Sequence, residues 1–143
     1  LAARPRTGPG ATDGSIEAPC LVMHEGSWYL FASFDLCCRG KDSTYRIVVG
    51  RSKSVTGPYL DKDGQSLAQG GGTLLLGGNQ AWYGRGGNSA YTFDGKDYLV
   101  LHAYEAADRG LQKLKIVEVT WDGSQWPVVD EGAVDAYRSI REN

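Results

Sequence analysis

The chain repeats itself at an interval of 69 residues, and this repeat limits what it can fold into. The segment GSWYLFAS at residues 26–33 aligns with GKDYLVLH at residues 95–102. The same offset places Ile47-Val48 on Ile116-Val117 and Pro58-Tyr59 on Pro127-Val128, without a gap. Such self-similarity is typical of proteins that stack copies of one supersecondary unit.

Each unit of the repeat predicts four antiparallel strands. β-Branched and aromatic residues dominate IEAPCLVMH and WYLFASF in the first unit, and DYLVLHAY and KLKIVEVTW in the second, and such residues favour strands. The pairs Asp94-Gly95 and Asp122-Gly123 lie between runs, and Asp-Gly favours tight hairpins. The last strand of the first unit is expected near GPYLDKDG or near GTLLL, and the sequence leaves both open. No stretch before residue 131 has a helical period.

Tandem four-stranded antiparallel units predict an all-β fold made of β-propeller blades. We expect residues 16–78 to form one blade and residues 79–130 the next. Residues 1–15 would be a leader or a loop from a preceding blade, and residues 131–143 a tail that forms a short helix or frays. Two blades cannot close a ring, because each repeat buries its faces against neighbours. The repeat therefore predicts missing blades, and the chain begins without a Met.

Composition argues against several classes of function. The chain has 143 residues with 41% hydrophobic and 22% charged residues, as is typical of a globular domain. Its net charge is −2 and it contains no basic block, so we expect no nucleic-acid partner, because phosphate binding needs clustered Lys and Arg. The apolar runs are too short for a membrane span, and we expect no membrane partner. The first residues lack the apolar core of a signal peptide.

The three cysteines, Cys20, Cys37 and Cys38, show no CxxC spacing. A structural zinc site is therefore not expected. The adjacent pair of Cys37 and Cys38 fits either a vicinal disulfide or two buried free thiols, and the sequence does not decide between them.

Polar residues at the ends of predicted strands are the candidates for chemistry. Glu17 opens the strand that would line a propeller channel, where it could meet a ligand; it could equally be a solvated carboxylate. His102 ends the apolar run at residues 98–101, which suits a hydrogen-bonded core residue or, less commonly, a metal or substrate contact. Arg51 could bind a carboxylate or a sugar hydroxyl, or lie on the surface. Trp82, in a Gly-rich segment, could stack on a sugar ring or fill the core.

Seven short motifs together resemble the C-terminal part of glycoside hydrolase family 43, and within it the endo-1,5-α-L-arabinanases. In chain order they are IEAP, YLFAS, CCRG, STY, VGRS, GPY and LHAY. Each motif is weak alone, but the ordered set covers most of residues 1–130. The resemblance implies a five-bladed propeller of four-stranded sheets, with this chain as its last two blades and the active site at one end of the axis.

The resemblance also implies an activity, the hydrolysis of α-1,5-linked arabinan with inversion of configuration. It assigns Glu17 as the general acid. It places His102 at an ion in the propeller centre, commonly calcium, which water would mostly coordinate because one imidazole is a poor calcium site. The expected substrate contacts are Phe34, Ser43, Arg51, Trp82 and Asn88. The enzyme would be secreted or periplasmic.

The chain departs from the family pattern in two places. The general-base Asp and the Asp that tunes the acid belong to earlier blades, and nothing before Glu17 matches them. The family often reads Gly-His-Asn-Ser where this chain has GGNS at residues 86–89, so one polar contact is expected to be lost. We therefore expect a partner, the N-terminal part of the propeller with two catalytic Asp, as a separate chain or as missing residues.

Two other interpretations remain open from the sequence. The chain could be a non-catalytic carbohydrate-binding or degenerate propeller piece, which keeps sugar-facing aromatic residues but lacks the base. It could also self-associate as two-blade units, although a dimer of four blades or a trimer of six would not match the five blades of the family.

Overall fold

The computed structural model of the protein describes residues 1–4, 8 and 14–132. Residues 133–143 of the tail expected at residues 131–143, and much of the leader expected at residues 1–15, lie outside the described residues. Over the described ranges, no helix is long and apolar enough to cross a membrane.

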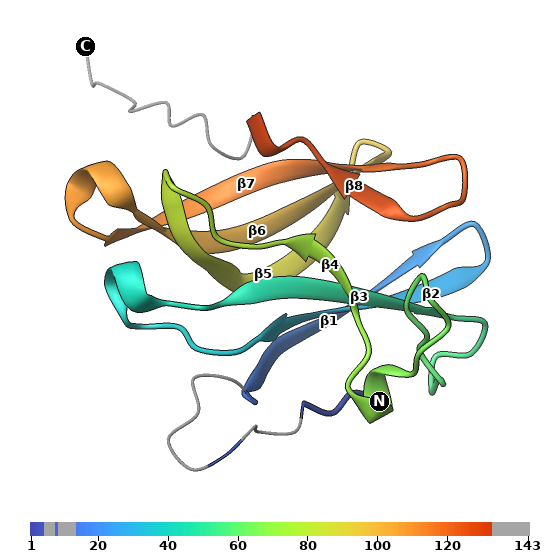
Figure 1. Cartoon of the computed structure of the whole chain (residues 1–143). Helices are drawn as coiled ribbons and strands as arrows, with labels where there is room; N and C mark the ends of the chain where they lie inside the picture. The colour runs from blue at the N-terminus through green and yellow to red at the C-terminus, as the bar shows by residue number, and fades with distance from the viewer. Residues whose placement is uncertain (5–7, 9–13, 133–143) are drawn as a thin grey trace.

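Eight strands form two four-stranded antiparallel sheets, each with its strands in chain order (Figure 1). The first sheet contains β1 (Ile16–His24), β2 (Ser27–Phe34), β3 (Arg46–Ser52) and β4 (Thr73–Leu76). The second sheet contains β5 (Trp82–Phe93), β6 (Lys96–Glu105), β7 (Leu111–Trp121) and β8 (Pro127–Val129). The prediction of an all-β chain with two four-stranded antiparallel units is thus confirmed for the described residues.

The first hairpin of each sheet has the turn that its sequence predicts. Glu25 and Gly26 connect β1 to β2 with φ of 45° and 69°, and Asp94 and Gly95 connect β5 to β6 with φ of 49° and 73°. Positive φ at both central residues defines the tight turn that matches the twist of paired strands. These turns fix the register of both hairpins.

The repeat holds for three strands of each sheet and fails at the fourth. Pro58-Tyr59 aligns in sequence with the start of β8, but in the structure these residues lie in a loop. Only Leu60, just beyond them, bridges to Arg51 of β3, as an isolated pair. The strand itself forms later, at Thr73–Leu76, so GTLLL is the correct alternative. About 20 residues connect the third and fourth strands of the first sheet, and the ungapped alignment does not predict this long connection.

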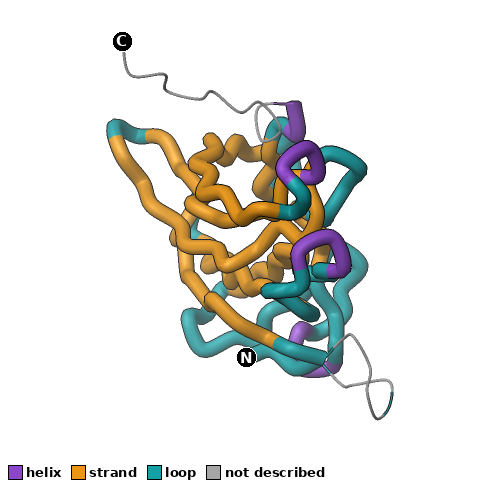
Figure 2. The backbone as a smooth tube through the Cα atoms, turned by 90° about the vertical axis from the view of Figure 1, so that its left-hand side faces the viewer, coloured by secondary structure: helices purple, strands orange, loops and turns teal. Residues whose placement is uncertain are grey.

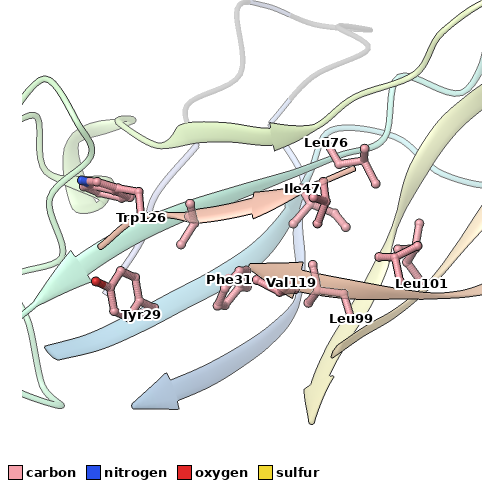
Figure 3. Close-up of a cluster of buried hydrophobic side chains, with 11 residues drawn as sticks. Tyr29, Phe31, Ile47, Leu76, Leu99, Leu101, Val119 and Trp126 are labelled. Carbon is pink, nitrogen blue, oxygen red and sulfur yellow. The ribbon is translucent and has the colours of Figure 1, made fainter. Parts of the chain in front are cut away.

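The core lies between the sheets, which pack face to face (Figure 3). Along β7, Val117 and Val119 are buried while Ile116 and Glu118 are exposed, which is the two-residue alternation of a strand with one covered face. The buried cluster draws on both sheets; its members are Tyr29, Phe31, Ile47, Val49, Leu76, Leu99, Leu101, Val117, Val119, Trp126 and Val129. This packing fixes the two sheets relative to each other.

Three short 3₁₀ turns lie outside the sheets, η1 (Gly40–Asp42), η2 (Leu67–Gln69) and η3 (Ala106–Asp108). Figure 2 views the stacked sheets from the left-hand side of Figure 1 and shows these turns as short helical pieces among the loops. In Figure 1, η1 and η3 lie at the same end of the two sheets. This is also the end at which β1 begins, and the candidate site is built there.

Candidate active site

The first strand of each sheet contains the same irregularity. The register of β1 against β2 shifts between Glu17 and Cys20, and that of β5 against β6 shifts between Gly86 and Ser89. A bulge of this kind bends a strand and redirects its side chains. It sets Glu17 opposite Ser33 in the first sheet and brings Gly86 opposite His102 in the second.

The carboxylate of Glu17 accepts a hydrogen bond from the hydroxyl of Tyr45, with 2.8 Å between the hydroxyl oxygen and Oε2. Tyr45 is only 2% exposed, whereas Glu17 is exposed. Burial raises the pKa of Tyr45 well above its ordinary value, and the hydrogen bond to the carboxylate raises it further. Tyr45 is therefore a protonated donor at any working pH, and Glu17 keeps access to solvent.

His102 lies beside these two residues. Its ring centroid is 5.6 Å from that of Tyr45, and its Nε2 is 3.3 Å from the hydroxyl oxygen of Tyr104. Burial lowers the pKa of His102, and the charge of Glu17 only partly opposes this. The imidazole is therefore neutral near pH 7 and can act as a ligand. The Tyr104 hydroxyl in turn accepts the backbone amide of Cys38 at 2.6 Å.

Asn88 and Ser33 join the two bulges across the interface between the sheets. The Ser33 hydroxyl donates to Oδ1 of Asn88 at 2.7 Å and accepts the amide of Gly87 at 2.9 Å. The amide nitrogen of Asn88 donates to the carbonyl of Ala18 at 3.1 Å. The structure places Asn88 inside the interface, where its hydrogen bonds connect the first strand of one sheet to that of the other; its contact with substrate stays a prediction.

Two glycines make room for the rings of the cluster. A Cβ atom at Gly86 would lie 2.4 Å from Cδ1 of Tyr45, and one at Gly87 would lie 2.5 Å from Nδ1 of His102. Gly87 also has a φ of +65°, which side chains rarely adopt. The family pattern with His at position 87 would therefore displace His102 in this backbone, so the Gly-Gly sequence belongs to the present arrangement.

Three other predicted substrate contacts have structural roles in the described chain. Phe34 is buried in a cluster with Ala32 and Val48, and Trp82 is 2% exposed, beneath the ammonium group of Lys115. Neither ring is available to stack on a sugar, so the core alternative for Trp82 is the correct one. The Ser43 hydroxyl accepts the amide of Arg39 at 3.0 Å and so shapes the loop before β3.

Arg51, the remaining predicted contact, lies at the other end of the first sheet. Its guanidinium group lies 4.8 Å from the ring centroid of Trp126 and donates to the carbonyl of Ser124 at 2.9 Å. On the same strand it is Ile47, four residues earlier, that pairs with Ser33 of the site. The structure therefore does not bring Arg51 to Glu17.

The cluster also contains Tyr45, Ser33 and Tyr104, which were not predicted as site residues. The signals were present: Tyr45 and Tyr104 belong to the STY and LHAY motifs, and the 69-residue offset aligns Ser33 with His102. Examining the repeat for what each unit places at the same position would have identified Ser33.

The adjacent cysteines lie at the edge of this cluster. All three cysteines of the chain are free thiols, and the Sγ atoms of Cys37 and Cys38 are 2.7 Å apart. Burial raises the pKa of Cys37 to about 11, with further contributions from Cys38 and from the charge of Glu17. The structure has free thiols rather than a disulfide, but they are not the buried thiols of the second alternative, because Cys37 is partly exposed and Cys38 is exposed.

The described side chains do not form a metal site by themselves. Across the described ranges, no group of three or more His, Cys, Asp or Glu residues could hold a metal ion. His102 offers a single neutral nitrogen, whereas calcium prefers six to eight oxygens. A calcium ion would therefore depend almost wholly on water and on groups outside the described part of the chain.

Two face-to-face antiparallel sheets, with a carboxylate and an imidazole converging where their first strands begin, define a pair of β-propeller blades with a site at one end. The sequence profile of Glycosyl hydrolases family 43 matches residues 7–127, and the chain belongs to this family. Solved arabinanases of the family are β-propellers.

Arabinanases and an arabinofuranosidase are among the relatives and solved structures similar to this chain. The chain is 63% identical over 131 residues to the extracellular exo-alpha-(1->5)-L-arabinofuranosidase ArbA of Cellvibrio japonicus, covering 92% of this chain and 38% of the relative. It is 50% identical over 127 residues to the extracellular endo-alpha-(1->5)-L-arabinanase 1 of Bacillus subtilis, covering 89% and 36%. The structure of Cellvibrio cellulosa alpha-L-arabinanase complexed with arabinohexaose superposes with a TM-score of 0.85 at 63% identity, over 90% of this chain and 41% of that one. The chain thus spans less than half of these relatives and corresponds to their C-terminal part.

Proposed function

We propose that this chain forms the last two blades of a five-bladed propeller that hydrolyses α-1,5-linked L-arabinofuranosyl bonds of arabinan. The observation that carries the proposal is the convergence of Glu17, Tyr45 and His102 at the end of the sheets. The names of the relatives, which match this chain over about nine tenths of its length, support the substrate. Because those relatives are named extracellular, we propose that the enzyme is secreted or periplasmic.

In the proposed reaction Glu17 is the general acid. Its carboxyl proton passes to the glycosidic oxygen as the bond from that oxygen to the arabinose carbon breaks. A water molecule attacks the same carbon from the opposite face and gives its proton to a carboxylate from an earlier blade. This inverts the configuration, and the two carboxyl groups of inverting glycosidases stand about 6.5–9.5 Å apart to leave room for the water. The exposure of Glu17 lets it reach a substrate.

The general base and the second Asp are proposed to come from the N-terminal blades. The outer face of the second sheet supports this part of the proposal, because it is apolar and uncovered. Leu114 and Ile116 of β7 are 72% and 67% exposed, and Tyr91 and Phe93 of β5 are exposed as well. An apolar blade face needs a neighbouring blade to bury it. We call the two-blade chain together with these N-terminal blades, from a separate polypeptide or a longer chain, the assembled enzyme.

His102 is proposed to contact an ion at the centre of the propeller, most of whose ligands are water. Its neutral imidazole is compatible with a nearby cation. The ion would act through its charge near the acid and the base, and the proposed proton transfers do not require it. We further propose endo action, as in the name of the Bacillus subtilis relative; the lengths of the first products released from arabinan test this directly.

The test is the substitution Glu17→Gln in the assembled enzyme, with Glu25→Gln in the β1–β2 turn as the matched control. General acid catalysis contributes roughly 10²–10⁴-fold, so arabinan hydrolysis should fall by about that factor. A 4-nitrophenyl arabino-oligosaccharide has a leaving group that needs little protonation, so its hydrolysis should fall much less. Equal losses on both substrates, or no loss on arabinan, would contradict the assignment of Glu17.

The non-catalytic alternative predicts a different result. Native mass spectrometry of the purified protein should show a complex heavier than the 15.5 kDa chain if N-terminal blades are supplied by a second polypeptide. A lone chain that binds arabino-oligosaccharides without hydrolysing them would support a carbohydrate-binding propeller piece instead.

A further inference from the structure

Tyr45 is placed to control the geometry of Glu17. It follows η1 and precedes β3, and its ring packs over the backbone of Gly86 in the other sheet, where no Cβ atom intervenes. The ring is also near the imidazole of His102. Elements of both sheets therefore fix Tyr45, and its hydroxyl ends 2.8 Å from Oε2 of Glu17.

Glu17 has little else to hold it. Its side chain is exposed, and among the residues that the structure describes no other hydrogen bond reaches its carboxylate. An unrestrained Glu side chain has several rotamers, and ordering it opposes binding. A misplacement of about 1 Å at a reacting group can lower a rate by as much as about 100-fold. Among the described residues, the contact with Tyr45 is therefore the one that restrains the carboxyl group.

We propose that Tyr45 is a positioning residue that holds Oε2 of Glu17 and so leaves Oε1 to carry the proton that is transferred. This inference rests on the proposed role of Glu17 as the general acid. The Tyr45 hydroxyl can donate to Oε2 whether Glu17 is ionised or protonated, because a protonated carboxyl keeps one acceptor oxygen. The proton of the acid form then belongs on Oε1, the oxygen that Tyr45 does not occupy.

A test of this contact needs a readout that depends on proton delivery by Glu17. Arabinan needs its leaving oxygen protonated, whereas a 4-nitrophenyl leaving group needs little protonation. A misplaced acid should therefore slow arabinan hydrolysis more than hydrolysis of the 4-nitrophenyl substrate, while a general loss of packing should slow both alike.

The experiment is Tyr45→Phe in the assembled enzyme, with Tyr59→Phe as the matched control. Tyr59 is equally buried and its hydroxyl also donates one hydrogen bond, to the carbonyl of Val55 at 2.9 Å, away from the site. For Tyr45→Phe we expect kcat to fall about 10-fold with KM little changed. Hydrolysis of the 4-nitrophenyl arabino-oligosaccharide should fall much less, because its leaving group needs little protonation. Tyr59→Phe should change neither.

A second variant reaches the same contact without removing the hydroxyl. In Gly86→Ala the new methyl group would collide with the Tyr45 ring and push it from Glu17. The loss of kcat should resemble that of Tyr45→Phe, and the double variant should be no worse than either single variant, because both remove one contact. Additive losses would overturn the proposal. If Gly86→Ala does not fold, Tyr45→Phe decides alone, provided that its melting temperature matches that of Tyr59→Phe.

The outcomes separate this inference from the proposed function. If Glu17→Gln abolishes arabinan hydrolysis while Tyr45→Phe keeps the kcat on arabinan, Glu17 is the acid and the positioning role of Tyr45 is wrong. If Glu17→Gln keeps the full rate, the acid assignment fails and the role of Tyr45 fails with it. A loss of kcat in Tyr45→Phe that is larger on arabinan than on the 4-nitrophenyl substrate, and absent in Tyr59→Phe, supports the inference. Equal losses on both substrates would overturn it.

Discussion

The two sheets have a bulge at the same place in their first strands, but the large polar side chain beside the bulge lies on a different strand in each sheet. The repeat aligns Glu17 with Gly86 and Ser33 with His102, and in each sheet the aligned pair lies opposite each other beside the bulge. In the first sheet the large residue is on the first strand and the small one on the second; in the second sheet the order is reversed. Glu17 and His102 can therefore approach each other without competing for the same space.

The sheets also differ on their outer faces. The outer face of the first sheet is partly covered by the chain itself, because Tyr59 and Leu67 of the long loop before β4 pack against Leu30. The corresponding connection in the second sheet is short, and Leu114 and Ile116 of its outer face stay exposed. The long loop before β4, where the repeat ends, thus makes the outer face of the first sheet less dependent on a neighbouring blade than the outer face of the second sheet.

The largest effect that tests this comparison is expected on assembly. Ile116→Lys places a charge on the exposed outer face of the second sheet. On assembly this loses the burial of an Ile side chain, worth about 1.5–3 kcal/mol, and adds the desolvation of an ammonium group. Binding of the N-terminal blades, supplied as a separate polypeptide and measured by calorimetry, should weaken by more than about 100-fold. Leu74→Lys on the outer face of the first sheet should weaken it less.

The control for this experiment is Val55→Lys, which also replaces an exposed apolar residue but lies in a loop. It should bind the N-terminal blades as tightly as the unsubstituted chain. Unchanged binding by Ile116→Lys would mean that the outer face of the second sheet is not where the missing blades dock.

The next effect tests the bulge of the second sheet. Gly87→Ala adds a methyl group that collides with His102 and requires a positive φ, so we expect a loss of about 1–3 kcal/mol in stability and a fall in activity of about 10-fold. Gly95→Ala in the β5–β6 turn, with φ of +73° and nothing near its Cβ position, has the backbone strain without the collision. Denaturation and arabinan assays should show that only Gly87→Ala affects activity. Equal effects would mean that the position of His102 is not important.

The comparison also shows what the sequence could predict. Hairpin turns such as Asp94-Gly95 and the alternation along each strand are local signals, so three strands of each sheet follow from the repeat. The place of β4 does not, because the long connection after β3 has its own packing, with Tyr59 and Leu67 turned inward. An ungapped alignment of the two units cannot predict a loop that is stabilised by tertiary contacts.

The sequence predicted those residues of the candidate site that a motif identifies. It was less informative where burial determines whether a side chain can reach a ligand. Glu17 and His102 were both proposed from the sequence, and the structure brings them together. Trp82 was expected to be a sugar platform or a core residue, and only the packing of the second sheet decides for the core. Tyr45 becomes a candidate only once Gly86 of the other sheet is known to lie against its ring, which is information about the interface between the sheets.

A smaller effect is expected on the pH dependence of folding stability, where His102 should differ from Ser33, the residue that the repeat aligns with it. Burial lowers the pKa of His102, so the unfolded chain binds this proton more readily than the folded one. Stability should therefore decrease as the pH falls below about 6.5, the ordinary value for His, until the folded histidine is protonated as well. Urea denaturation of the assembled enzyme between pH 7 and 5 should show a shallower dependence for His102→Gln. Identical slopes would mean that His102 is solvated as freely in the folded protein as in the unfolded one.

The smallest expected effect concerns the position that the repeat aligns with Gly87. Ala18 has a φ of 49° in the bulge of β1, so an alanine holds there the left-handed backbone for which the second sheet uses glycine. Ala18→Gly removes that strain, while the glycine gives the unfolded chain more freedom, and we expect a net gain of about 0.5 kcal/mol. Ala90→Gly in β5 has only the entropic penalty and the lost packing against the core, so it should lower stability by about 0.5–1 kcal/mol. Opposite shifts in melting temperature would show that the bulge of β1, like that of β5, favours glycine at its residue with positive φ. Two decreases of equal size would show that the methyl group of Ala18 contributes more by packing than it loses by strain.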